Sequence, residues 1–83
     1  MPTIAIVDGI RIVIFFNDHD PPHFHAILGE TSLRMSIASG TVMGDRGPAS
    51  MERKLGRWLD EHRDEMMLAW KAVRAGQRPQ GIE

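Results

Sequence analysis

The chain has 83 residues, of which 42% are hydrophobic and 25% are charged, and its formal net charge at pH 7 is −1. These proportions are typical of a globular protein and exclude a disordered or collagen-like chain. The lack of cysteine excludes a disulfide framework, a thiolate zinc site and a cysteine nucleophile.

The length predicts a single domain over residues 1–83. A domain of this size buries a modest fraction of its surface, which favours support from a partner subunit, a homodimer being the simplest case. No run approaches the roughly 20 apolar residues of a membrane span. The N-terminus also lacks the basic-then-apolar order of a signal peptide. We therefore expect a cytoplasmic protein without a membrane partner.

Residues 3–16 predict a β-hairpin. Thr3–Val7 and Ile10–Phe16 are rich in β-branched and aromatic residues. Between them, Asp8-Gly9 is a dipeptide that supplies the positive φ angles of a tight type I′ turn. Both faces of the second strand are largely apolar, so we expect it to lie inside a sheet rather than at an edge.

A rigid loop follows at Asn17–Pro22, because Asn and Asp favour turns and two prolines prevent helix and central-strand pairing. The chain then predicts a second hairpin, in which His23–Leu28 and Thr31–Ala38 are joined by Gly29-Glu30. A short strand at Thr41–Met43 completes the β-rich part.

The register of the second hairpin follows from a two-residue turn at Gly29-Glu30, which pairs the residues on either side of it. Two apolar pairs then share one face: Phe24 with Met35, and Ala26 with Leu33. Two polar pairs share the other face: His25 with Arg34, and His23 with Ser36. This clean separation by polarity favours the register, since a shift by one residue would mix the two faces.

The rest of the chain predicts helix. Apolar residues recur at three- and four-residue steps from Met51 to Val73. Pro48 suits the first helical turn, with Ser50 or Asp45 as the expected cap, and Gly76 is the expected stop.

One helix over Pro48–Ala75 would extend about 42 Å, which is long for so small a domain. We therefore favour two helices with a break near Glu61–Asp64, and one long helix is the alternative. Trp58 and Trp70 are expected as core or interface anchors, and His62 as a buried structural histidine. Together the elements predict an α+β fold: an antiparallel sheet of four or five strands followed by one long or two shorter C-terminal helices, packed on one face.

Three of the four histidines fall within one short stretch, at His19, His23 and His25. His23 and His25 lie two positions apart on a strand, so they project from the same face. The expected register places Arg34 beside them. The proline-stiffened loop brings His19 and Asp18 over the same end of the sheet. This pattern predicts one surface on which imidazoles, a guanidinium group and carboxylates converge.

One interpretation of this surface is acid–base catalysis. Histidine exchanges protons near neutral pH, and the planar donors of arginine match phosphate oxygens. Such a set of groups can cleave RNA without a metal, which makes the chain a candidate ribonuclease. The expected catalytic residues are His23, His25, Arg34 and His19, and the expected binding residues are Asn17, Asp18 and Ser36.

A second interpretation is a divalent metal site formed by His23 and His25 with His19 or Asp18. Imidazole suits zinc, iron, nickel or copper, but Arg34 argues against a metal because a second cation nearby is unfavourable. A third interpretation is structural, with the histidines bonded to loop carboxylates. No cofactor is favoured from the residues alone, and a divalent metal is the alternative.

A small basic group lies at the start of the expected helix, and its members are Arg46, Arg53, Lys54 and Arg57. A solvated helix face is the ordinary explanation for such a group. Contact with RNA or an acidic partner is the alternative.

Three stretches of the chain together carry a resemblance to a known family. They are Met1-Pro2-Thr3-Ile4, the run from Phe16 to His25, and Trp58-Leu59-x-x-His62-Arg63-x-Glu65 followed by Trp70. The chain resembles the small bacterial family catalogued as domain of unknown function 4160. The positions that match the family's signature are Asn17, Asp18, His19, Pro21, Pro22, His23 and His25.

The resemblance implies a two-gene arrangement that looks like a toxin–antitoxin pair, with a small cognate protein encoded nearby as the partner. It implies no established catalytic residues. We predict that the chain is one component of such a pair, acting as a toxin on RNA by metal-independent histidine chemistry. The alternatives are a non-catalytic protein–protein interaction module, as antitoxin or regulator, and a small metal-binding protein.

Overall fold

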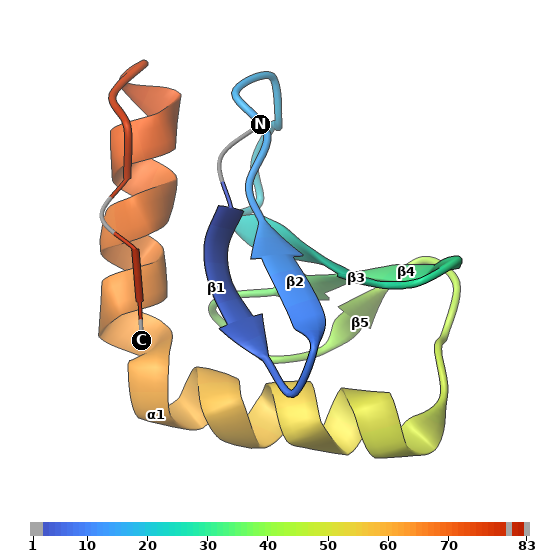
Figure 1. Ribbon diagram of the computed structural model, residues 1–83. Helices are drawn as coiled ribbons and strands as arrows, with labels where there is room; N and C mark the ends of the chain where they lie inside the picture. Colours follow the sequence, from blue (N-terminus) through green and yellow to red (C-terminus); the bar gives the residue numbers. More distant parts are fainter. Residues whose placement is uncertain (1–2, 80, 83) are drawn as a thin grey trace.

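The computed structural model describes residues 3–79, 81 and 82. Met1 and Pro2, which contribute to the resemblance, lie outside the described residues. The elements in chain order are β1 (Thr3–Val7), β2 (Ile10–Val13), β3 (His23–Leu28), β4 (Thr31–Ser36), β5 (Val42–Met43) and α1 (Ala49–Arg74). The five strands form one antiparallel sheet in which each strand pairs with the next along the chain (Figure 1). The predicted α+β fold is confirmed.

The first hairpin turns at Asp8 and Gly9, whose φ angles of 49° and 81° are both positive, as the dipeptide predicted. β2 lies between β1 and β3, also as predicted, but it is shorter than expected because it ends at Val13. The reason lies in the next residues. The amide of Phe15 donates a hydrogen bond of 2.9 Å to the Asp18 carboxylate, and the Phe15 carbonyl accepts one of 3.1 Å from the Asp18 amide.

The second hairpin has the predicted register at every pair, from Leu28 with Thr31 to His23 with Ser36. β4 ends at Ser36 rather than Ala38, because the Ser36 carbonyl accepts a hydrogen bond of 2.8 Å from the amide of Gly40 and so closes a turn. β5 is confined to two residues, one fewer than expected.

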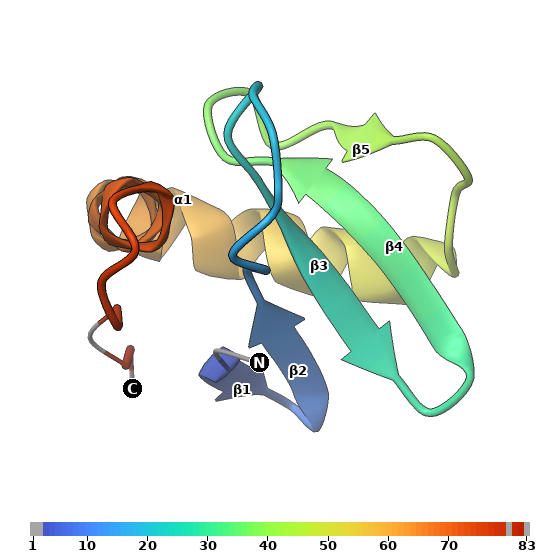
Figure 2. The same cartoon turned by 90° about the horizontal axis from the view of Figure 1, so that it is seen from above.

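α1 consists of two helical segments that meet at a kink, so the break that we favoured near Glu61–Asp64 is present, although the two segments form one continuous element. His62, inside the interval where the break was expected, has non-helical angles of φ −129° and ψ 19°. The first half of α1 therefore runs beneath the strands, whereas the second half stands beside β1 (Figures 1 and 2).

His62 is half-buried, so its expected burial was wrong. Its Nδ1 donates a hydrogen bond of 2.8 Å to the carbonyl of Trp58. Its ring stacks on the Trp58 indole with a centroid distance of 4.8 Å. Because Trp58 is itself only partly buried, the stacked imidazole keeps contact with solvent.

The N-terminus of α1 is stabilised differently from our expectation. Pro48 is the N-cap residue, and no side chain caps the helix. Ser50 lies inside the helix and Asp45 lies upstream of it, so neither occupies the capping position. The carboxylate of Glu52 reaches back instead and accepts a hydrogen bond of 3.1 Å from the amide of Gly47.

The C-terminus of α1 ends as the sequence predicted. Gly76 adopts a φ of 76° just after the helix. The amide of Gly76 donates a hydrogen bond of 3.0 Å to the carbonyl of Val73, and the amide of Gln77 donates one of 2.8 Å to the carbonyl of Ala72. These two bonds form a Schellman motif. No helix within the described residues combines the length and the apolar character needed to cross a membrane.

The core lies between one face of the sheet and α1. Its largest fully buried side chains include Phe24, Ile12, Leu55, Leu59 and Met66. Phe24 is on the core face of β3, so its neighbours in sequence, His23 and His25, must project from the opposite face. The packing of this one strand thereby fixes where the two histidines lie.

Candidate functional site

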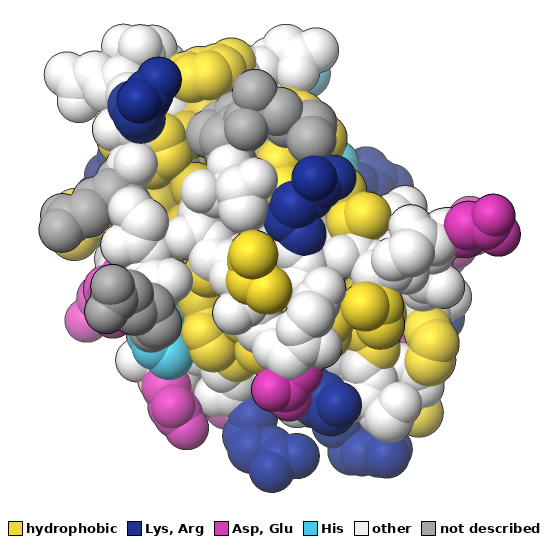
Figure 3. All heavy atoms as spheres, in the orientation of Figure 1, with side chains coloured by type: hydrophobic (Ala, Val, Ile, Leu, Met, Phe, Trp, Pro, Cys, Tyr) yellow, Lys and Arg dark blue, Asp and Glu magenta, His cyan; other side chains and the backbone are white. Residues whose placement is uncertain are grey.

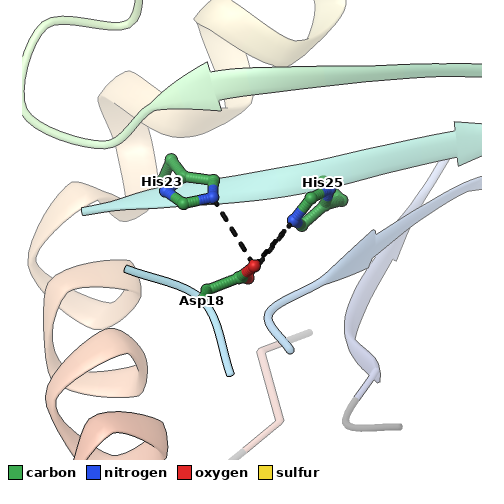
Figure 4. Close-up of side chains that lie close together, drawn as sticks. All are labelled: Asp18, His23 and His25. Atoms are coloured by element: carbon green, nitrogen blue, oxygen red, sulfur yellow. Dashed lines mark hydrogen bonds and ion pairs between the residues drawn. The ribbon is translucent and has the colours of Figure 1, made fainter. Parts of the chain in front are cut away.

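Two histidines from the start of β3 and one aspartate from the preceding loop lie close together (Figure 4). Oδ1 of Asp18 is 3.2 Å from Nε2 of His25 and 3.7 Å from Nε2 of His23. The three side chains are largely shielded from water, with exposed fractions of 12% for Asp18, 8% for His23 and 20% for His25. Two imidazole nitrogens therefore face one carboxylate in a sheltered setting.

The orientation of His23 is set by its other ring nitrogen. Nδ1 lies 2.8 Å from the carbonyl oxygen of Pro21, which can only accept a hydrogen bond. This contact assigns the proton of a neutral imidazole to Nδ1 and leaves the lone pair on Nε2. The distance of 3.7 Å from Nε2 to Asp18 is too long for a hydrogen bond. A neutral His23 therefore presents the lone pair of Nε2 toward the carboxylate.

Asp18 is held by contacts on both its side chain and its backbone. Its Oδ2 accepts the hydrogen bond from the Phe15 amide. Its carbonyl oxygen accepts a hydrogen bond of 2.6 Å from Nη1 of Arg74, on the last turn of α1. The loop that carries the carboxylate is thus connected both to Phe15, two residues after β2, and to the distant helix end.

Aromatic rings surround the two imidazoles. The ring of Phe15 meets that of His25 edge-on with a centroid distance of 4.6 Å. The buried Trp70 lies tilted against His23 at 5.4 Å. Such contacts restrict the rotation of both imidazoles and exclude water from one side of the site.

The site opens into a pocket of about 280 Å³. Its lining includes six of the seven residues that the sequence singled out: Asn17, Asp18, His19, His23, His25 and Arg34. The seventh, Ser36, is not among them. Its hydroxyl accepts a hydrogen bond of 3.3 Å from the amide of Ser39, as part of the turn after β4.

The geometry favours Asp18 over His19 as the third candidate ligand. Within the described part of the chain, the ligand atoms of Asp18, His23 and His25 all lie within 4.8 Å of one another. His19 is exposed and is not part of this group, although it lines the pocket.

Arg34 lies directly across from His25, as predicted. A Cβ atom added at Gly44 would lie 2.8 Å from Nη2 of Arg34, so the guanidinium lies beside the residue that follows β5. Arg34 also lines the pocket, together with Met43 and the two histidines.

Acidic side chains pair with members of the basic group at the start of α1. Figure 3 shows Lys and Arg side chains along the lower edge of the molecule, with acidic side chains among them. Nε of Arg46 donates to Glu52 at 3.0 Å, and Lys54 lies 3.8 Å from Asp8. The hydrogen bond from Arg46 holds the pKa of Glu52 below its ordinary value. These pairs agree with a solvated helix face.

Sequence reasoning missed Arg74 and Phe15 as supports of the site, and it placed Trp70 only in the core. Phe15 is next to the loop, so the apolar run of the second strand could have suggested its place. Arg74 offered no signal, because its partner is 56 residues away.

A family model matches residues 9–71, which is well over half of the chain, and its description is "Domain of unknown function (DUF4160)". No curated protein and no solved structure gives a significant match. The matched range includes β2 to β5, the histidine loop and most of α1. The chain therefore belongs to the family of domain of unknown function 4160.

Proposed function

We propose that the chain binds a divalent transition-metal ion, such as Zn²⁺ or Fe²⁺, through Asp18, His23 and His25. The convergence of one carboxylate oxygen and two Nε2 atoms supports this proposal. Metal–ligand bonds of about 2.0–2.2 Å place neighbouring ligand atoms of a tetrahedral site about 3.3 Å apart. Two of the three separations, 3.2 and 3.7 Å from Asp18 to the histidines, lie close to that value, and all three ligand atoms lie within 4.8 Å of one another.

The surroundings of the three ligands also support a metal. A metal-binding histidine usually donates a hydrogen bond from its second ring nitrogen to a carbonyl or carboxylate oxygen. Metal-binding carboxylates also accept hydrogen bonds from neighbouring groups. His23 donates to the carbonyl of Pro21, and Asp18 accepts from the amide of Phe15. A purely structural hydrogen-bond cluster would account for the contact between His25 and Asp18. In such a cluster, however, the lone pair on Nε2 of a neutral His23 would have no partner. A bound cation would accept that lone pair.

Three protein ligands leave coordination positions open, as in catalytic rather than structural metal sites. An ion held there would act as a Lewis acid toward a molecule in the pocket. A set of two histidines and one carboxylate suits Fe²⁺ and Zn²⁺ better than Mg²⁺ or Ca²⁺, which prefer oxygen ligands.

The test is metal analysis of the full chain, purified without an affinity tag or chelator, followed by calorimetric titration with Zn²⁺. We expect one ion per chain and a loss of 10- to 100-fold in affinity for each of His23→Gln, His25→Gln and Asp18→Asn. His19→Gln is the matched control, because His19 lines the same pocket but is exposed and is not among the three clustered ligands. A chain that takes up no stoichiometric ion, or loses no more affinity in the ligand variants than in the control, would contradict the proposal.

The second candidate function is metal-independent cleavage of RNA, as the toxin of a two-gene pair in the cytoplasm with a small cognate protein as partner. Its support is the contact between Asp18 and His25, since a carboxylate that orients an imidazole is a common acid–base arrangement. Arg34 on the pocket wall would hold the phosphate. Cleavage of RNA by the metal-stripped protein in excess chelator would favour this function over metal binding, and intact RNA would count against it.

A further inference from the structure

The pocket extends beyond the three ligand atoms and reaches Arg34, a cation that has no partner within the part of the chain that the structure describes. Arg34 lines the pocket and is exposed. Among the described residues it makes no hydrogen bond and no ion pair, and of the arginines without such a contact it alone lines this pocket. A guanidinium group with its donors free at the edge of a pocket is suited to an anionic ligand.

The charge of the pocket depends on the metal. With neutral histidines, the lining contains the carboxylates of Asp18 and Asp20 and the guanidinium of Arg34, so negative charge is in excess. A divalent cation on Asp18 reverses that excess. Asp45 lines a neighbouring hollow with Arg34 but makes no ion pair with it. The empty pocket should therefore repel anions and the metal-loaded pocket should attract them.

We propose that the metal-loaded pocket binds a phosphate group, whose oxygens contact the ion on one side and Arg34 on the other. This inference rests on the metal site proposed above. Open coordination positions accept an oxygen ligand, and the planar fork of arginine matches a second pair of phosphate oxygens.

Phosphate fits better than carboxylate because it carries more oxygens, which point in four directions. It can contact the ion through one oxygen and still offer a pair of oxygens to the guanidinium, whereas a carboxylate has only two oxygens in all. The guanidinium is beside Gly44 and the ligand atoms are at the start of β3, so the two cationic groups are on different walls of the pocket. The volume of about 280 Å³ leaves room for an organic group on the phosphate, so a phosphate ester is the expected form.

The test uses the full chain loaded with Co²⁺, whose visible absorption bands report a change in coordination. Inorganic phosphate and phenyl phosphate are titrated separately. We expect saturable shifts with both probes, and tighter binding of the ester if the organic group occupies the pocket. Arg34→Gln should weaken phosphate binding at least tenfold and change the Co²⁺ affinity by less than about twofold. Chain without metal should bind neither probe in calorimetry.

Arg11→Gln is the matched control, because Arg11 is exposed and projects from the same face of the sheet without reaching the pocket. It should bind phosphate like the wild-type chain. If Co²⁺ itself fails to bind, the metal site and this inference are both wrong. If Co²⁺ binds but phosphate causes no shift, or Arg34→Gln binds phosphate as tightly as Arg11→Gln, the metal site stands and this inference is overturned. Equal binding of the two probes would support the phosphate site with free phosphate as its ligand.

Discussion

Nη1 of Arg74 donates a hydrogen bond of 2.6 Å to the carbonyl oxygen of Asp18, although the two residues are 56 positions apart. The guanidinium also lies over the ring of Trp70, with 5.9 Å from its carbon to the ring centroid. One side chain near the end of α1 thus connects the loop of the proposed metal site with the indole that packs on His23.

Replacing Arg74 should weaken metal binding without unfolding the protein. We expect Arg74→Ala to raise the Kd for Zn²⁺ about 3- to 10-fold, because a lost charged hydrogen bond at an exposed position is worth roughly 1 kcal/mol. Arg78→Ala, at an exposed position beyond the helix, should leave the Kd unchanged. Calorimetric titration of both variants measures the effect. Equal affinities would show that the loop holds its position without the helix.

Two glycines should respond in opposite directions to the same substitution. A Cβ atom at Gly47 would lie 2.6 Å from Cδ2 of the buried Leu33, so Gly47→Ala should destabilise the fold by about 1–3 kcal/mol. Gly56 lies within α1 with nothing near its added Cβ, so Gly56→Ala should stabilise the fold by about 0.5–1 kcal/mol. Urea unfolding of both variants is the measurement, and a stabilised Gly47→Ala would contradict the packing described here.

Glu52 should make stability depend on pH in the acidic range. Its pKa is lowered in the folded state, first by the hydrogen bond from Arg46, so its contribution is present above the ordinary carboxyl pKa. That contribution is lost as the pH falls through the lower pKa of the folded state. The stability difference between wild type and Glu52→Gln should therefore shrink between pH 7 and pH 3. Denaturant midpoints at both pH values measure it.

Arg46→Gln serves as the control for this dependence. It removes the group that lowers the pKa of Glu52. The Glu52→Gln substitution in that background should show a smaller change with pH than in the wild-type background. An unchanged dependence would mean that Glu52 is stabilised by some other contact.

The proposed toxin role predicts an effect in cells. Induction of the chain alone should arrest bacterial growth, and a His23→Ala/His25→Ala variant of equal expression should not. Growth curves and immunoblots of both strains are the measurements. If neither strain slows, the toxin role is wrong. If both arrest equally, toxicity does not come from the histidine site.

The second hairpin could be predicted in full because its polarity alternates strictly and its turn is only two residues long. Every predicted pair from Leu28 with Thr31 to His23 with Ser36 is present. The extent of β2 could not be predicted in the same way. Its apolar run continues through Phe16, and only a contact between the Phe15 amide and a side chain three residues later ends the strand. The pattern of apolar residues cannot predict a hydrogen bond of this kind.

For the site, the period of the strand was enough to place His23 and His25 on one face. The choice between Asp18 and His19 as their neighbour was not available from the pattern, because the two are adjacent in an irregular loop. The structure turns Asp18 inward through its bonds with Phe15, and leaves His19 exposed. Arg74 and Trp70 contact the site from the second half of α1. Their positions depend on the bend at His62, because the bend sets the direction of that half of the helix.

The bend at His62 also has a consequence for the order in which the molecule is assembled. Each strand pairs with its neighbour along the chain, so the sheet can form from short-range contacts as the chain leaves the ribosome. The loop with Asp18 gains its last anchor only after the second half of α1 has emerged and folded back beside β1. During biosynthesis, tight capture of an ion would therefore come late, and a nascent chain that stops before the bend would have both histidines but a poorly held third ligand.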